Sequence, residues 1–348
     1  NGEGSEVTVR GFGGGFNLVT LNGRQMPAAN VGSITGNPLD QGNSGSSRSF
    51  DFSNLASEGV SGLQVYKTGN ASVQTGGIGA TINVETIKPL EAGASKGSIG
   101  VKAVNDVSGD GITPELSGLF SWANDEDTFG VAVFGSYQER DSGSRHASVE
   151  QYSIRTWDNT KPDNLSDLGL VDGVTIVNEP NNGQLVVRPS NLGLGVNEDQ
   201  RERVNGQVTL QYRPSEVLTL TADAMYAENT LESTSLIDGI WFNGTVDYVE
   251  YDGNPVVAAP RVFAEDVNGG KDFFFQNLDM GVKDTLRSVG FNAELLASDN
   301  LTVSLDYASS EAESGPDAPL GKNVLRLNIA GATAGWQAVD FTQEIPQG

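Results

Sequence analysis

Apolar and polar residues alternate along several segments of roughly ten residues in the C-terminal three quarters of the chain. The clearest segment has one apolar face, formed by Val204, Val208, Leu210 and Tyr212, and one polar face, formed by Asn205, Gln207, Thr209 and Gln211. Successive side chains of a strand point to opposite faces, so this pattern predicts long strands. About 9–11 residues suffice for a tilted strand to cross a bilayer, and barrels of the outer-membrane type alternate in this way.

The joins between the expected strands vary in length in a regular order. We expect strands near residues 97–105, 113–123, 128–142, 200–213, 217–229, 285–297 and 300–312. Every second join is tight, and the long joins, 143–199 and 230–284, fall only between the tight ones. Up-and-down strands place alternate joins on opposite sides of a membrane, with short periplasmic turns and long extracellular loops. Residues 91–348 are therefore predicted to form antiparallel transmembrane β-barrel strands with two long extracellular loops.

Composition argues against several functional classes. The chain has 21 Lys and Arg against 45 Asp and Glu, and its formal charge of −24 repels phosphate backbones, so we expect no nucleic-acid partner. Cysteine is absent and His146 is the single histidine. This leaves no material for disulfides, thiolate zinc sites or a multi-histidine centre. We therefore predict no catalytic residues, no enzyme activity, no cofactor and no metal site.

The first ninety residues follow a different pattern, in which short β-like runs are separated by glycines. The runs at 63–67 and 81–87 predict strands, and Asn22-Gly23 predicts a tight turn because both residues accept positive φ angles. Residues 50–58 predict a helical turn that Ser53 could cap. Residues 1–90 are therefore expected to form a small α+β unit.

Several short segments of this unit carry a family resemblance. They are, in order, Val9-Arg10-Gly11-Phe12, Leu21-Asn22-Gly23-Arg24, Phe52-Ser-Asn-Leu-Ala-Ser-Glu58 followed by Val65-Tyr66-Lys67, and Gly76-Gly-Ile-Gly-Ala-Thr-Ile-Asn83 ending at Lys88-Pro89-Leu90. In this order and spacing, and followed by alternating strands, they resemble the plug domain of TonB-dependent outer-membrane receptors. The similarity is to the large proteobacterial subgroup of that family, and it extends over essentially the whole chain.

The resemblance implies a mainly β fold: a partial plug domain over residues 1–90, then the N-terminal part of an outer-membrane barrel over residues 91–348. The family barrel has about 22 strands, so the roughly seven strands expected here form an incomplete barrel and the chain looks like a fragment. Arg10 matches the plug arginine that pairs with barrel carboxylates in the family. We expect those carboxylates to lie on strands outside this chain.

The function implied by the resemblance is ligand-gated, TonB-dependent active uptake of a scarce nutrient across the outer membrane of a Gram-negative bacterium. The implied partners are outer-membrane lipid, a small-molecule nutrient, and TonB with its inner-membrane energising complex, which would act through an N-terminal segment missing from this sequence. An oligosaccharide is the expected cargo because the subgroup is often linked to oligosaccharide uptake. Two alternatives are a ferric-siderophore receptor and a non-transporting surface or adhesion protein.

The two long loops contain many aromatic residues, whose faces can bind sugar C–H surfaces or flat ligands. The candidates for ligand contact are Trp157, Trp241, Phe242, Tyr248, Tyr251 and Phe274. The alternative is that these side chains pack the loops onto each other and onto the plug.

The turn at residues 106–111 resembles the start of a calcium-binding loop, with oxygen-bearing side chains at Asp106, Ser108 and Asp110. The twelfth position holds Ser117, where a calcium loop needs a bidentate glutamate. A polar hairpin turn is therefore the favoured interpretation.

Overall fold

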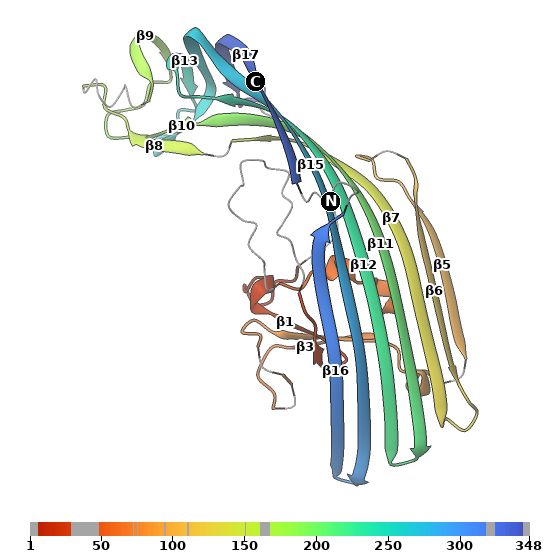
Figure 1. The fold of residues 1–348 in the computed structure, drawn as a ribbon. Helices are drawn as coiled ribbons and strands as arrows, with labels where there is room; N and C mark the ends of the chain where they lie inside the picture. The colour runs from red at the N-terminus through yellow and green to blue at the C-terminus, as the bar shows by residue number, and fades with distance from the viewer. Residues whose placement is uncertain are drawn as a thin grey trace.

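The computed structural model describes residues 6–28, 49–71, 73–74, 76–93, 95–109, 111–149, 151–160, 168–317 and 324–343. One large, mainly antiparallel sheet curves around a small N-terminal unit, by which we mean the described residues up to Ala92 (Figure 1). The mainly β fold class expected from the sequence is confirmed. Among the described residues, no helix is both long enough and apolar enough to cross a membrane.

The N-terminal unit is built on a four-stranded sheet in the order β2-β1-β4-β3. Its strands are β1 (Leu18–Leu21), β2 (Arg24–Gln25), β3 (Gly62–Tyr66) and β4 (Thr81–Glu85). Strands β1 and β4 run parallel, and the other two pairs are antiparallel. Asn22 and Gly23, which join β1 to β2, have φ angles of 51° and 84°. The predicted tight turn is therefore confirmed.

The helical elements of this unit are short. They are the 3-10 helices η1 (Gly14–Phe16), η2 (Phe52–Asn54) and η3 (Ser57–Gly59) and the single α-helical turn α1 (Pro89–Ala92). The helical turn expected over residues 50–58 is thus divided into η2 and η3. The expected cap, Ser53, lies inside η2, and the carboxylate of Asp51 instead accepts a hydrogen bond from the Ser53 N–H at 2.8 Å. The prediction of the capping residue was wrong because η2 begins at Phe52.

The large sheet contains all seven strands expected from the sequence, paired in chain order. They are β5 (Lys96–Val104), β6 (Thr113–Ala123), β7 (Phe129–Ser148), β11 (Asn191–Ser215), β12 (Leu218–Trp241), β15 (Pro260–Ser298) and β16 (Leu301–Pro316). Every pairing between neighbours is antiparallel. The tight joins lie together at one end of the sheet (Figure 1). This is the predicted up-and-down arrangement.

Four of these strands run well into the segments expected to be long loops. Strands β7 and β11 pair as far as Ser148 and Gly193, and β12 pairs with β15 as far as Gly239 and Phe274. The limits predicted for the loops, 143–199 and 230–284, were therefore too wide. Apolar residues continue in the extensions, but several of them are buried, such as Leu278, Met280 and Val282 of β15, and pairs such as Asp199 with Ser233 join polar residues. The outward apolar alternation is therefore less regular there, although the backbone ladder continues.

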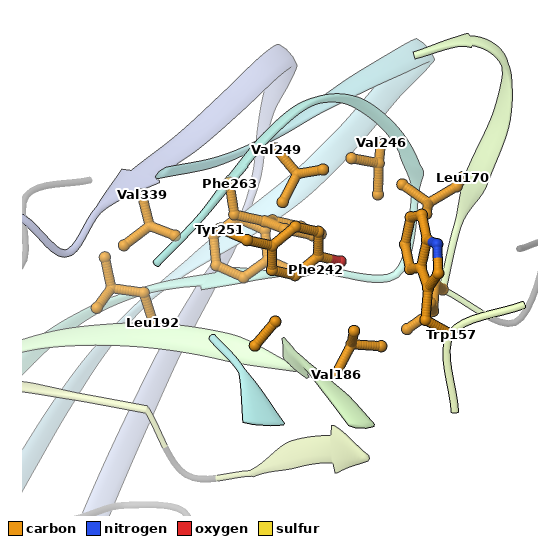
Figure 2. Close-up of a cluster of buried hydrophobic side chains, with 12 residues drawn as sticks. Trp157, Leu170, Val186, Leu192, Phe242, Val246, Val249, Tyr251, Phe263 and Val339 are labelled. Atoms are coloured by element: carbon orange, nitrogen blue, oxygen red, sulfur yellow. The ribbon is translucent and has the colours of Figure 1, made fainter. Parts of the chain in front are cut away.

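The shorter strands lie at the end opposite the tight turns. Strands β9 (Leu170–Val177), β13 (Thr245–Tyr251) and β17 (Val324–Asp340) extend the large sheet beside β15, whereas β8 (Tyr152–Thr156), β10 (Leu185–Pro189) and β14 (Val257–Ala258) form a three-stranded sheet. A core of twelve buried apolar side chains joins the two sheets (Figure 2). We call these six strands, together with the core that joins them, the loop unit.

The two faces of the large sheet have the polarity that a lipid-exposed barrel requires. Polar side chains of β11 turn toward the N-terminal unit and are buried, with exposed fractions of 2% for Asn205, 4% for Thr209 and 3% for Gln211. The apolar side chains between them are exposed on the outer face, 42% for Leu210 and 51% for Tyr212. In water, exposed apolar surface contributes nothing to folding, so this arrangement suits a sheet whose outer face meets hydrocarbon.

Candidate functional site

The side chain of Arg24 links the N-terminal unit to two strands of the large sheet. Its Nη1 lies 2.6 Å from Oδ2 of Asp223 on β12. Its Nε and Nη2 donate to the two carboxylate oxygens of Asp306 on β16, at 2.7 and 3.1 Å. A bidentate pair of this kind fixes both the distance and the orientation of the guanidinium. Arg24 therefore connects β2 to strands that are separated from each other by β15.

Gly290 on β15 provides the space for this contact. It pairs with Asp223 of the neighbouring strand, so it lies beside the path of the guanidinium. A Cβ atom at position 290 would stand 1.7 Å from Nη1 of Arg24 and 2.3 Å from its Cζ. Only glycine allows Arg24 to lie over β15 and reach both carboxylates. We call Arg24, Asp223, Gly290 and Asp306 the Arg24 cluster.

The Arg24 cluster keeps its arginine charged. Burial opposes the charged form, but the hydrogen bonds and charges of Asp306 and Asp223 outweigh burial and raise the pKa of Arg24 above its usual value. The side chains of Arg24 and Asp223 are only 9% and 8% exposed, whereas that of Asp306 is 38% exposed. The contact with Asp223 is therefore the desolvated half of the cluster, and the contact with Asp306 is partly open to water.

Arg10, the residue expected to pair with barrel carboxylates, makes a different contact. Its Nη2 donates to the backbone oxygens of Ile78 and Gly79, at 3.3 and 2.8 Å, within the N-terminal unit. Of the two described arginines of the N-terminal unit, it is Arg24 that pairs with carboxylates of the large sheet. Asp223 and Asp306, the partners of Arg24, lie on strands of this chain, and the pairing expected of Arg10 with strands outside the chain stays a prediction. The sequence signal was a single acidic residue in the middle of each of two apolar-alternating strands.

An apolar core lies next to the Arg24 cluster. Seven side chains of the N-terminal unit pack against β12 and β15: Val19, Leu21, Met26, Phe50, Leu55, Ile82 and Val84. The sheet contributes Met225, Ala227 and Leu286. Nearby, the buried Nδ2 of Asn229 on β12 donates to Oδ1 of Asn54 at 3.0 Å. The N-terminal unit is thus held on β12 and β15 by desolvated contacts.

The contact with β5, β6 and β7 is different. A cavity of about 260 Å³ separates the N-terminal unit from these strands and from β11. Its wall carries charges of both signs, from Glu58, Lys102, Glu115, Arg140 and Arg203. The Nζ of Lys102 bridges Glu58 of the N-terminal unit and Glu115 of β6, at 2.9 and 3.3 Å. We call this space the side cavity.

The aromatic residues proposed as ligand contacts fall into three groups. Trp157, Phe242 and Tyr251 are 0%, 3% and 2% exposed and belong to the core of the loop unit. Trp157 and Tyr251 meet edge to face with ring centroids 5.9 Å apart (Figure 2). Trp241 and Tyr248 are half-buried. Phe274 is placed in β15, but its side chain lies outside the described residues.

The burial of Trp157, Phe242 and Tyr251 agrees with the packing alternative for those three residues. Burial also raises the pKa of the Tyr251 phenol. Ligand binding by any of the six is not tested by these positions and stays a prediction. The sequence could not separate the two interpretations, because the packing joins β8–β10 and β13–β15 from distant parts of the chain.

A buried ion pair stabilises the loop unit. Glu265 on β15 is 0% exposed, and its Oε1 accepts from Nη2 of Arg188 at 2.6 Å and from the Gly244 N–H at 2.9 Å. Its Oε2 accepts from Nε2 of Gln337 at 3.0 Å. A buried carboxylate needs this degree of hydrogen bonding. The loop unit therefore has a packed interior in which the buried carboxylate is hydrogen-bonded on both oxygens.

The turn at 106–111 has the geometry of a polar turn in its described part. Oδ1 of Asp106 accepts from the N–H and the hydroxyl of Ser108, at 2.9 and 2.6 Å. Asp110 lies outside the described residues. In the described part of the chain, no group of three or more acidic or histidine side chains could hold a metal ion.

Comparison with known proteins identifies the N-terminal unit. Residues 1–81 match the family model described as the TonB-dependent receptor plug domain, which confirms the resemblance found in the sequence. Proteins with this domain are outer-membrane receptors of Gram-negative bacteria, so the expected location is confirmed as well. No curated protein matches the chain.

Solved structures with similarity to the chain include three receptors. The siderophore receptor PirA from Acinetobacter baumannii is 11% identical with a TM-score of 0.31, and the match covers 89% of this chain and 51% of that one. A mutant of the ferric enterobactin receptor PfeA from Pseudomonas aeruginosa is 10% identical with a TM-score of 0.32, covering 89% and 52%. PirA from Pseudomonas aeruginosa is 12% identical with a TM-score of 0.28, covering 88% and 52%. The chain therefore spans about half the length of these receptors.

Proposed function

We propose that this protein, whose first 81 residues match the plug domain of TonB-dependent receptors, takes up a scarce nutrient across the outer membrane. In this proposal the large sheet spans the bilayer, the plug fills its concave side, and the loop unit faces the outside. Ligand binding outside and a pull by TonB on the plug together open a path. TonB, with its inner-membrane energising complex, is the proposed protein partner.

The observation that carries this proposal is the inverted polarity of the large sheet. On β11, polar side chains are buried against the plug and apolar side chains are exposed on the outer face. Backbone groups of the plug bind directly to this polar face, because the Ala56 N–H donates to Oδ1 of Asn205 at 3.3 Å and the Leu90 N–H to Oε1 of Gln211 at 3.0 Å. A strand whose polar side chains face the plug and whose apolar side chains face outward is what a gated passage through lipid requires.

For the cargo we propose a ferric siderophore, with an oligosaccharide as the second candidate. The expected oligosaccharide has no support among the comparisons, whereas the similar structures are named as siderophore receptors. Trp241 and Tyr248 are proposed as ligand contacts because they keep part of their rings exposed. Trp157, Phe242 and Tyr251 would then act by holding the loop unit in shape.

The test is binding and uptake by the intact protein in outer membranes, measured with a panel of ferric siderophores and with maltose-, chitin- and xylan-type oligomers. The proposal expects tight binding of at least one ferric siderophore, and uptake that is lost in cells lacking TonB. Binding of an oligomer alone would overturn the choice of cargo. Binding with uptake that does not depend on TonB would overturn the proposed mechanism, and binding without uptake would favour a surface protein.

A further inference from the structure

We propose that, among the strands described in this chain, cargo passes the plug beside β5, β6, β7 and β11, through the side cavity, and not beside β12, β15 and β16. In this scheme, which rests on the proposed function, the plug stays attached to β12, β15 and β16. The 3-10 helix η3 is the gate. The proposal follows from the different contacts that the plug makes on its two sides.

On the β12, β15 and β16 side, the contacts are apolar or desolvated. Met225, Ala227 and Leu286 of the sheet are 6%, 1% and 4% exposed where they pack on the plug. Arg24 and Asp223 form their ion pair with little access to water. Separating these groups would expose apolar surface and leave a buried charge without its partner, and both changes are costly. These contacts therefore favour a plug that stays attached to β12, β15 and β16.

On the side-cavity side, the principal ion pairs are exposed. The side chains of Lys102 and Glu58 are 57% and 36% exposed, and ion pairs open to water contribute little to stability. Water can replace each partner as the two separate. Opening here would also uncover Phe134 and Ala132 beside η3, each 4% exposed, whereas the core on the other side contains ten buried apolar side chains. The lining offers hydrogen-bonding groups from Ser117, Ser136 and Gln138, which suit a polar solute.

The side cavity ends at η3. Gly59 lies against Phe134 on β7, and a Cβ atom at position 59 would stand 2.7 Å from Cδ1 of that ring. Beyond this contact, toward the tight turns, the space beside Gly59, Ala132 and Thr209 has a volume of only about 10 Å³. A space of that size holds roughly one water at most. Displacement of η3 is therefore the first step, which connects the side cavity with this small space. Below it α1, whose Leu90 N–H donates to Oε1 of Gln211, must also move to complete the path.

Two matched positions can report which side opens. Thr209 on β11 lies below η3, and Ser288 on β15 lies beside Met225 in the closed contact. Both carry a small hydroxyl side chain on the inner face, and each is 4% exposed. The chain has no native cysteine, so Thr209→Cys and Ser288→Cys each introduce a single thiol. Ser136→Cys, in the wall of the side cavity, is the control that the protein is inserted and accessible at the cell surface.

The experiment measures labelling of each thiol by a membrane-impermeant charged maleimide added to cells that carry or lack TonB. We expect Ser136→Cys to react in both strains. Thr209→Cys should react several-fold faster in cells with TonB than in cells without it. Ser288→Cys should react equally slowly in both.

The outcomes separate the route from the proposed function. A TonB-dependent increase at Ser288→Cys that equals or exceeds the increase at Thr209→Cys would overturn the route, because the whole plug or its other side would then have moved. It would leave TonB-dependent gating intact. No TonB-dependent increase at either position, with Ser136→Cys labelled normally, would overturn both the route and the proposed gating.

Discussion

Replacing Gly290 with alanine should break the ion pairs of Arg24 with β12 and β16 without removing any charge. The new Cβ would lie 1.7 Å from Nη1 of Arg24. The flexible arginine can swing away from it, so the cost is the loss of its ion pairs and not a lasting clash. A charge that loses its partner while buried costs about 3–5 kcal/mol.

The two halves of the cluster do not contribute equally to this figure. Asp223 is 8% exposed and would be left buried, so it accounts for most of the cost. Asp306 is 38% exposed, and its partly solvated pair contributes about 1 kcal/mol or less. A loss of at least about 3 kcal/mol corresponds to a factor of roughly 100 in the equilibrium between docked and released states of the β1–β2 hairpin.

Hydrogen exchange of the Met26 amide measures this equilibrium, because its N–H donates to the Val19 oxygen inside that hairpin. We expect exchange roughly 100-fold faster in Gly290→Ala than in the parent protein. Gly206→Ala is the control, since a Cβ at position 206 meets nothing within 4 Å. Equal exchange in the two variants would refute the role assigned to Gly290 and Arg24.

Three further predictions concern other contacts. Asp223→Asn should destabilise plug docking by about 2 kcal/mol more than Asp306→Asn, because its carboxylate is the buried one; equal losses in hydrogen exchange would contradict this. The hydrogen bond and charge of Lys102 hold the pKa of Glu58 below its usual 4.5. The contribution of the Glu58–Lys102 ion pair to plug docking should therefore be complete above pH 4.5 and lost as the pH falls through the lowered pKa. Glu58→Gln should remove that part of the pH dependence, as followed by hydrogen exchange of η3. Trp157→Ala should destabilise the loop unit by about 3–5 kcal/mol and admit protease there, while the tight-turn end of the sheet stays resistant.

The strands of the large sheet could be predicted because their signal is local. Alternation of apolar and polar residues along ten residues is set by the lipid on one face and the plug on the other. In the extensions of β7, β11, β12 and β15, buried apolar residues such as Leu278, Met280 and Val282 are mixed with polar pairs. The outward alternation that identified the strands therefore does not mark their ends.

The Arg24 cluster depends on contacts that no local pattern contains. Arg24 meets Asp223 and Asp306 across sequence separations of 199 and 282 residues. The family resemblance indicated that an arginine of the plug pairs with carboxylates of the sheet, but the placement of β2 over β15 decides which arginine does so. The packing of Trp157 against Tyr251 is non-local in the same way. An aromatic residue in a long join has the same local sequence signature whether it packs or binds.

The central claim is that the outer face of the large sheet meets lipid and the inner face meets the plug. The most direct measurement attaches a fluorescent label to Leu210→Cys or to Gln211→Cys in the intact protein reconstituted in bilayers that contain brominated lipid. Leu210 is 42% exposed on the outer face and Gln211 is 3% exposed on the inner one. Strong quenching at position 210 with little at position 211 is the predicted result. Equal quenching at both positions, or none at position 210, would contradict it.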